Sequence, residues 1–438
     1  MAEAPTSESV YTKLHRIAMQ AKDAPQMVFN NLAHLVDLAL LREAYRRTRK
    51  DGAPGVDGTT AADYARNLEE NLQGLLDRMK SGLYYAPSVK RVHIPKDDKG
   101  NTRPIGIPTF EDKVLQRAVA MVLEAIYEQD FLDCSYGFRP KRSAHQALEA
   151  IRRTLQDKRG GWVLEVDIKG FFDALDHKHL RDILDLRVRD RGTRRIIHKW
   201  LNAGVMEGLS LTRPTSGTPQ GGVISPLLAN IYLHEVLDKW FEEDVKPVLA
   251  APATLIRYAD DFVIVFQSHR DAVRVWNVLP KRLGKYGLEL HEQKTRLVDF
   301  RKPTGEFRPE TFDFLGFTHY WGKNKFGGWV VFRKTSDTRL KRGLKGIAEY
   351  CADNRHVPVE EQHRALYRKV LGHFSYFGLA GNCRALSRFI FHVRRIWRMW
   401  LSRRSQRGYV SWEKMKLLLE RYPLPKVRVF HRFGAAKL

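Results

Sequence analysis

The feature that most constrains this sequence is a pair of adjacent aspartates, Asp260 and Asp261, between two runs of β-prone residues. Residues 255–258 and 262–266 are mostly apolar, so the pattern predicts a β-hairpin with both acids at its tip. Two like charges this close disfavour ionisation, and a divalent cation offsets that cost. A lone Asp-Asp pair is more often an ordinary turn, so the metal interpretation depends on the rest of the sequence.

A second strand-like run, Val163–Ile168, carries a third acid, Asp167. Between the two acidic runs, the segment Ser216–Asn230 has glycines that permit close backbone approach, followed by an apolar stretch that starts a helix. For the glycines alone, a flexible turn is the alternative. Three carboxylates on two runs suit two metal ions ~3.5–4 Å apart, which activate an attacking hydroxyl and hold the leaving phosphate oxygens.

Two cations precede the first acid on a predicted strand–turn–strand unit. The strands are expected at Val89–Ile94 and Arg103–Ile107, with a polar turn at Lys96–Asn101 between them. Lys96 and Arg103 suit the binding of an incoming triphosphate, although cations at a turn are otherwise solvated surface.

Helical periodicity predicts two elements nearer the N-terminus. A basic amphipathic helix is expected over Leu32–Arg49, stopped by the glycines and proline of 51–55. A second is expected over Ala61–Lys80, ending at Ser81 and Gly82.

The charge of the chain is strongly positive and uneven. Lys and Arg number 75 against 50 Asp and Glu, a net charge of +25, and residues 341–438 alone hold 22 basic against 6 acidic residues. Such a field favours polyanions, nucleic acid above all; a basic soluble protein or a binder of acidic membranes is the alternative. An apolar stripe over Leu386–Leu401 predicts a helix whose other face is basic, either a phosphate-contacting or a solvated face. The candidate RNA-binding residues there are Arg394, Arg395, Arg398, Arg403 and Arg404.

Location is indicated by what the sequence lacks. The polar first ten residues do not resemble a signal peptide, and no run approaches the ~18 apolar residues of a membrane span. The three cysteines, Cys134, Cys351 and Cys383, are far apart and give neither a disulfide framework nor a zinc signature. We therefore expect a reducing, cytoplasmic location and no membrane partner.

Taken in order, these motifs resemble those of the bacterial group II intron-encoded reverse transcriptases, also called maturases. Tyr258-Ala259-Asp260-Asp261 has the family's usual form, and three further blocks match its motifs: 51–58, 134–140 and 218–222. The resemblance runs from about 50 to 317 and is looser from 335 onward.

The resemblance implies an α+β, right-hand polymerase with fingers, palm and thumb, the palm being a split βαβ sheet. The expected divisions are a helical N-terminal extension (1–85), fingers and palm (86–330), a basic helical thumb or maturase region (331–405) and a short DNA-binding-like segment (406–438). Many family members carry a C-terminal HNH nuclease, whereas this sequence ends at Leu438 without that signature. Target cleavage by this chain is therefore not expected.

The resemblance also implies roles for particular residues. The metal site would be Asp167, Asp260, Asp261 and the Ile168 carbonyl, holding two Mg²⁺ ions with Mn²⁺ as a possible substitute. The nucleotide site would contain Lys96, Arg103, Gln220, Lys294 and Phe171, the last as a steric gate against the ribose 2′-hydroxyl. Phe171 and Phe172 can also be simple palm core, and one of them is expected to be. The primer grip would be Phe314, Leu315, Gly316 and Phe317.

The expected function is RNA-directed DNA synthesis with dNTPs on an RNA template and a DNA primer. Binding of group II intron RNA, or of another structured RNA, would add assistance in splicing and retrohoming. One alternative is a domesticated reverse transcriptase in host defence or DNA repair. Another is a non-catalytic RNA-binding splicing factor, which the three intact acids disfavour.

Overall fold

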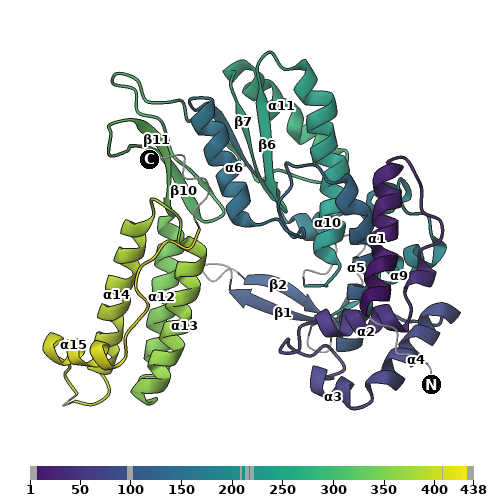
Figure 1. The fold of residues 1–438 in the computed structure, drawn as a ribbon, viewed down its shortest axis with the longest axis horizontal. Helices are drawn as coiled ribbons and strands as arrows, with labels where there is room; N and C mark the ends of the chain where they lie inside the picture. Colours follow the sequence, from purple (N-terminus) through teal and green to yellow (C-terminus); the bar gives the residue numbers. More distant parts are fainter. Residues whose placement is uncertain are drawn as a thin grey trace. The chain divides into compact units, whose positions relative to one another are not determined.

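The computed structural model describes residues 7–95, 102–207, 210–212, 217, 221–406 and 408–431. The chain divides into two compact units: Met1–Ala147 with Leu164–Leu297, and Leu148–Val163 with Val298–Leu438. The helices and strands of both units are labelled in Figure 1. None of the described helices is both long and apolar enough to cross a membrane.

The first unit mixes helices with two sheets. Its helices are α1 (Ser7–Asp23), α2 (Leu38–Arg47), α3 (Ala61–Arg66), α4 (Leu68–Ser81), α5 (Phe110–Asp130), α7 (Phe171–Ala174), α8 (His177–Asp185), α9 (Arg191–Leu201), α10 (Ser225–Leu233) and α11 (His269–Gly284), with 3₁₀ turns η1 (Ala33–Leu35) and η4 (Lys246–Val248). Its strands are β1 (Val89–Pro95), β2 (Thr102–Ile107), β4 (Val205–Glu207), β5 (Ser210–Thr212), β6 (Ala253–Tyr258) and β7 (Asp261–Phe266). Helix α6 (Ala144–Asp157) and strands β3 (Trp162–Asp167) and β8 (Arg296–Asp299) cross the boundary between the units.

One sheet carries the predicted acidic hairpin, in the strand order β6-β7-β3-β8. Strands β6 and β7 pair antiparallel with Tyr258 opposite Asp261, so Ala259 and Asp260 form a two-residue turn. Ala259 has φ 57°, the left-handed region that two-residue hairpin turns require. This pairing confirms the predicted hairpin and places Asp260 in its turn, whereas Asp261 is the first residue of β7 rather than part of the tip. The rest of β7, Phe262–Phe266, is buried throughout.

The other sheet has the order β2-β1-β4-β5. Strands β1 and β2 pair antiparallel from Lys90 opposite Ile107 to Pro95 opposite Thr102, which confirms the two predicted strands. The turn itself, including Lys96, lies outside the described residues.

The two N-terminal helices are shorter than the sequence predicts. Over 32–49, helix α2 begins only after Asp37, whose side chain accepts a hydrogen bond from the Leu40 amide and caps the helix. Over 61–80, Asn67 leaves helical geometry (φ −123°, ψ 46°) and separates α3 from α4. The predicted stop is confirmed, because Gly82 follows Ser81 in the left-handed conformation (φ 81°) that ends many helices.

Helix α10 continues into two π-helical segments, η2 (His234–Asp238) and η3 (Trp240–Val245). A π-helical turn has a wider spacing of hydrogen bonds than an α-helical one and is frequent near functional sites. The first of these segments ends at the buried Asp238, whose carboxylate pairs with Arg257 of strand β6.

The second unit combines a short sheet with a helical group. Strands β9 (Phe312–Phe314), β10 (Phe317–Lys323) and β11 (Trp329–Thr335) form a sheet in the order β11-β10-β9. Helices α12 (Asp337–Asp353), α13 (Val359–Phe377) and α14 (Cys383–Leu401) pack side by side, and α15 (Trp412–Arg421) follows (Figure 1). The predicted apolar stripe of α14 is confirmed by the burial of Leu386, Phe389, Ile390, Val393 and Trp397.

Candidate active site

The hairpin tip and the end of β3 face one polar cavity of about 400 Å³ in the first unit. Asp167 and Asp260 both line it, so two acids that are distant in sequence share one space. Asp261, the first residue of β7, is exposed and is not among the lining residues. The described residues that line the cavity are Thr102, Arg103, Pro104, Asp167, Ile168, Lys169, Gly170, Phe171, Asp173, Asp260, His291 and Lys294.

The two acids that line the cavity differ in their electrostatic surroundings. Burial raises the pKa of Asp260 above its ordinary value, and the negative charge of Asp167 acts in the same direction. Asp167 instead receives an ion pair from Lys294, with Nζ 2.5 Å from Oδ2. The segment after α11 is held against the end of β3 because the His291 amide donates to the Asp167 carbonyl at 2.8 Å.

These carboxylates can be tested for their fit to a metal ion. Oxygen donors facing a polar cavity are what a hard divalent cation prefers, and a cation would offset the mutual repulsion that raises the pKa of Asp260. Within the described ranges, no group of three or more His, Cys, Asp or Glu side chains is arranged to hold a metal ion. The carboxylates of Asp167 and Asp260 thus fit a divalent cation, whereas Asp261 is exposed and is not among the residues that line the cavity.

Phe171 lies at the edge of the cavity and in the core at once. Its side chain is 2% exposed and lines the cavity. Its ring packs edge-on against Phe172 at 5.3 Å and Tyr232 at 6.4 Å between centroids. The helix that carries it, α7, starts just after Gly170, which caps it in a left-handed conformation (φ 55°).

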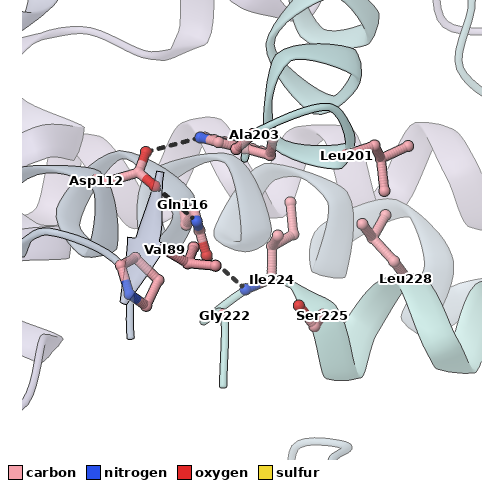
Figure 2. A pocket seen from close by; sticks show the side chains of 11 residues that line it. Val89, Asp112, Gln116, Leu201, Ala203, Gly222, Ile224, Ser225 and Leu228 are labelled. Atoms are coloured by element: carbon pink, nitrogen blue, oxygen red, sulfur yellow. Dashed lines mark hydrogen bonds between the residues drawn. The ribbon is translucent and has the colours of Figure 1, made fainter. Parts of the chain in front are cut away.

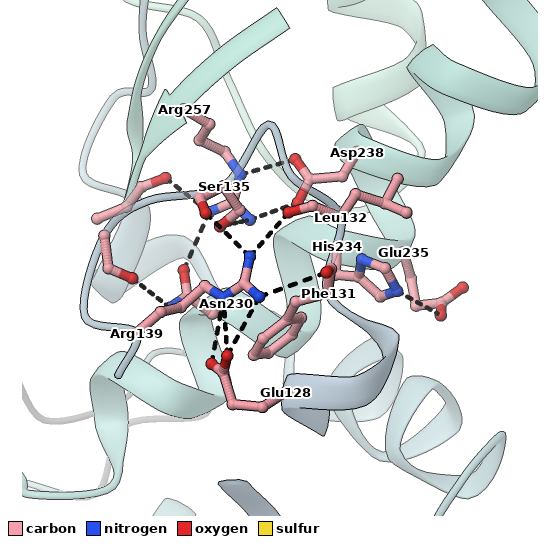
Figure 3. Close-up of polar contacts among 12 residues, drawn as sticks. Glu128, Phe131, Leu132, Ser135, Arg139, Asn230, His234, Glu235, Asp238 and Arg257 are labelled. Atoms are coloured by element: carbon pink, nitrogen blue, oxygen red, sulfur yellow. Dashed lines mark hydrogen bonds and ion pairs between the residues drawn. The ribbon is translucent and has the colours of Figure 1, made fainter. Parts of the chain in front are cut away.

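Arg257, a buried arginine that was not predicted from the sequence, donates a hydrogen bond to the hairpin turn. Arg257 Nη1 donates to the Ala259 carbonyl and to Asn230 Oδ1, both at 3.0 Å (Figure 3). Its Nε and Nη2 pair with the Asp238 carboxylate at 2.7 and 2.5 Å. Its Nη2 also donates to Ser135 Oγ at 2.9 Å. A charge within an apolar strand run was the signal in the sequence, since such a residue needs a buried partner.

The loop 134–139 packs directly against the same turn. Gly137 has no room for a side chain, because a Cβ there would lie 2.3 Å from the Ala259 nitrogen. Asn230 Nδ2 donates to the Gly137 carbonyl at 2.7 Å. Arg139 anchors the far side of the loop by pairing with Glu128 at 3.1 Å and donating to the Ser135 carbonyl of the loop and to the Leu132 carbonyl just before it (Figure 3).

A second buried polar pair, also missed from the sequence, supports the glycine-rich segment. Asp112 and Gln116 lie one turn apart on α5, and Gln116 Nε2 donates to Asp112 at 3.0 Å. Gln116 Oε1 then accepts from the Val223 amide at 2.8 Å, just after Gly222, and from the Ile224 amide at 3.4 Å, the second of which is drawn in Figure 2. Trp200 Nε1 donates to Asp112 at 2.7 Å. The pair borders a cavity of about 20 Å³, room for about one water molecule. Polar residues at helical spacing within an otherwise apolar helix were the available signal.

Comparison with known proteins gives the family of the chain. The sequence pattern of the family described as reverse transcriptase (RNA-dependent DNA polymerase) matches residues 94–319, about half of the chain. The chain belongs to the reverse transcriptase family. Its mixture of helices and strands agrees with the α+β reverse transcriptase fold that the sequence predicts.

Individual relatives of this reverse transcriptase family member extend the comparison. Group II intron-encoded protein LtrA of Lactococcus lactis subsp. cremoris is 41% identical over 228 residues, which are 52% of this chain and 38% of that protein. Protein YkfC of Escherichia coli (strain K12) is 34% identical over 320 residues, 64% of this chain and 83% of that protein. Nuclear intron maturase 2, mitochondrial, of Arabidopsis thaliana is 28% identical over 177 residues, 31% of this chain and 24% of that protein.

The predicted resemblance to group II intron-encoded reverse transcriptases is confirmed by these relatives. The matched region spans well under half the length of the Lactococcus protein, at 38%.

The remaining predicted site residues of this reverse transcriptase are spread more widely. Arg103 lines the cavity with Lys294, whereas Lys96 and Gln220 lie outside the described residues. The predicted primer grip belongs to the second unit, where residues 314–317 form the tight turn between β9 and β10. Leu315 and Gly316 have φ 50° and 82° in that turn. The Leu315 carbonyl accepts from the Tyr376 hydroxyl at 2.9 Å.

The five predicted RNA-binding arginines, also in the second unit, fall into two groups. Arg394, Arg395 and Arg403 are exposed. Arg398 is half-buried, donates to the Val410 carbonyl at 3.0 Å and lies over the Trp412 ring at 4.5 Å. Arg404 is half-buried too and donates to the Val357 carbonyl. The structure thus gives Arg398 and Arg404 contacts within the protein, and leaves three arginines facing solvent.

Proposed function

We propose that this chain is an RNA-directed DNA polymerase that extends a DNA primer on an RNA template. The observation that carries the proposal is the cavity shared by Asp167 and Asp260, because it sets two carboxylates beside two cations, Arg103 and Lys294. Carboxylates bind the metal ions that in turn bind phosphate oxygens, and cationic side chains bind the triphosphate directly. Few reactions other than phosphoryl or nucleotidyl transfer need both in one polar space.

In this proposal, each group has a defined task. Asp167, Asp260, Asp261 and the Ile168 carbonyl would hold two Mg²⁺ ions, or Mn²⁺ in their place, which supply activation of the primer hydroxyl and stabilisation of the leaving pyrophosphate. Arg103 and Lys294, with Lys96, bind the triphosphate of the incoming dNTP and orient it. Lys294 exchanges its ion pair with Asp167 for a phosphate contact as the nucleotide enters.

Other residues select and position the substrates. Phe171 borders the cavity and excludes a ribose 2′-hydroxyl, and Gln220 lies under the nascent base pair. The turn Phe314–Phe317 grips the primer strand. The proposed architecture has fingers and palm over 86–330, following a helical extension (1–85). A thumb or maturase region (331–405) and a short DNA-binding-like segment (406–438) complete it.

We also propose that the chain binds a structured RNA, group II intron RNA first of all, and assists its splicing and mobility. Two observations support this. Residues 341–438 carry 22 basic against 6 acidic residues, and Arg394, Arg395 and Arg403 are exposed on α14 and just after it. Relatives named as an intron-encoded protein and an intron maturase belong to the same family.

Asp260→Ala tests the polymerase proposal. The variant should lose primer extension on an RNA template with Mg²⁺ present, while RNA binding stays within about threefold of wild type, because the carboxylate serves chemistry rather than RNA contact. Asp244→Ala, which removes an exposed aspartate of η3, is the matched control and should extend normally. Extension by Asp260→Ala within tenfold of wild type would refute the assignment. RNA binding by a wild-type chain that extends no primer would favour the non-catalytic splicing factor instead.

A further inference from the structure

Phe138 is an exposed aromatic residue in an unfavourable backbone conformation beside the catalytic turn. Its side chain is 58% exposed, so its ring gains little from burial. Its φ is 54°, a left-handed conformation that costs free energy for any residue with a Cβ. Neither feature stabilises the fold. Isolated exposed apolar residues are common, but few combine exposure with strain at a site of chemistry.

The loop that carries Phe138 is fixed on both sides. On one side, the Tyr136 amide donates to the Arg257 carbonyl at 2.8 Å, and the Arg257 amide donates to the Cys134 carbonyl at 2.8 Å, which ties the loop to β6. On the other side, the buried Arg139 holds the Leu132 and Ser135 carbonyls (Figure 3). The loop is therefore a rigid support, and the position of Phe138 is set by it.

The Phe138 ring lies next to a second aromatic ring, that of Tyr258, beside the catalytic turn. The Phe138 and Tyr258 rings lie 6.1 Å apart between centroids, tilted by 41°. Tyr258 precedes the turn residues Ala259 and Asp260, and Gly137 touches the Ala259 backbone. Two neighbouring aromatic rings thus lie beside the turn that bears Asp260, the half-buried acid of the cavity.

We propose that Phe138 contacts the base pair at the primer terminus, with its ring stacking on the nucleotide there. The proposal rests on the proposed function, because a primer hydroxyl reacting at Asp260 places the terminal base pair next to this turn. The exposed Phe138 ring lies 6.1 Å from the Tyr258 ring, beside the turn at which that base pair would sit. An aromatic face is tolerant of sequence, as a polymerase that copies any template requires.

The decisive variant is Phe138→Gly, because it separates a contact with substrate from a role in folding. Glycine removes the ring and also relieves the left-handed strain, so the Tm should equal or exceed that of wild type. The KM for primer–template, and the Kd measured by fluorescence anisotropy, should rise about tenfold, as is typical when one stacking partner is removed. The KM for dNTP should stay within about twofold. Phe138→Tyr keeps the ring and should restore primer–template affinity.

A control and a direct probe complete the experiment. Phe326→Ala removes another exposed phenylalanine, 72% exposed in the β10–β11 turn of the second unit, and should leave the KM for primer–template unchanged. 2-Aminopurine at the primer 3′ end should be quenched by wild type and brighter with Phe138→Gly, with no difference when the probe lies far upstream in the duplex. An unchanged KM and Kd in Phe138→Gly, or a lowered Tm with no change in affinity, overturns the inference. Failure of the proposed function looks different: no variant, nor wild type, would extend the primer.

Discussion

Arg257 and Asp238 form an ion pair in which neither side chain is exposed to solvent. The pair joins strand β6 to the π-helical segment η2, and the same guanidinium donates to the Ala259 carbonyl of the hairpin turn at 3.0 Å. The position of Asp260 therefore depends on the guanidinium of Arg257, a residue that does not line the cavity.

Arg257→Met should destabilise the protein strongly. Removal of the guanidinium leaves the buried Asp238 carboxylate without its partner, which typically costs about 3–5 kcal/mol. The free energy of unfolding from urea titration measures this. Lys246→Met is the control, since it breaks an exposed pair with Glu242 on η3–η4 that should contribute at most ~1 kcal/mol. Equal destabilisation in the two variants would contradict a special role for the buried pair.

Asp112 should make stability fall as the pH rises. Burial raises the pKa of Asp112 from 3.8 to about 6. Between those values the folded state binds a proton that the unfolded state has released, so the free energy of unfolding decreases with pH, by up to ~3 kcal/mol for this group. Urea titrations at about pH 4 and about pH 6.5 measure the difference. Asp112→Asn should remove this contribution, whereas Asp244→Asn should keep it. A pH profile unaltered by Asp112→Asn would show that the pKa of Asp112 is not raised by folding.

Phe171→Ala should affect both selectivity and stability. If the ring is the steric gate, removing it raises incorporation of ribonucleotides relative to deoxyribonucleotides in single-nucleotide extension. Because the ring is 2% exposed, its removal should also cost about 3–5 kcal/mol of unfolding free energy. The assay is therefore run well below the variant's Tm. Phe172→Ala, which alters the less buried neighbour, is measured in parallel as the alternative gate. An unchanged discrimination ratio for Phe171→Ala makes that ring core alone and moves the gate to Phe172.

The triple variant in which Gln replaces Arg394, Arg395 and Arg403 should bind RNA more weakly, because it loses three positive charges. Each arginine that no longer neutralises a phosphate reduces the slope of log affinity against log salt by ~0.7 on single strands, so the slope of the triple variant should be shallower by up to about 2. Primer extension on a short saturating template should change far less, because it needs the cavity rather than an extended RNA surface.

The control for this triple variant changes three exposed lysines of the first unit, Lys178, Lys281 and Lys285, to Gln. A salt slope equal in the two triple variants would mean that the α14 arginines form a solvated face. Arg398 and Arg404 are kept, because their hydrogen bonds to backbone carbonyls would confuse removal of charge with disruption of packing.

Local patterns in the sequence were enough to predict much of this structure. The hairpin around Asp260, the strands β1 and β2 and the stripe of α14 follow from alternation or helical periodicity within one segment. The approach of Asp167 to Asp260 followed from the family resemblance, which supplied the long-range pairing that periodicity cannot.

The contacts that the sequence did not predict join residues that are distant in the chain. Gln116 supports Val223, and Arg257 pairs with Asp238, through contacts that no window of one element contains. The break at Asn67 was missed for another reason: the apolar period continues across it, and only the backbone changes direction.

The number of residues in the π-helical segment η2 determines whether Asp238 faces Arg257, and with it whether the turn that holds Asp260 is supported. Asp238 ends a run in which the chain is wound more loosely than an α-helix. Five residues at the π-helical spacing turn through about the same angle as four α-helical residues, so deleting one residue among 234–237 would let the run relax to ordinary α-helix and leave the following side chains facing as before. Inserting one residue there would instead turn Asp238 by about 100° away from Arg257, and the turn holding Asp260 would lose its support. A single-codon insertion here should therefore impair primer extension, whereas a single-codon deletion should be tolerated.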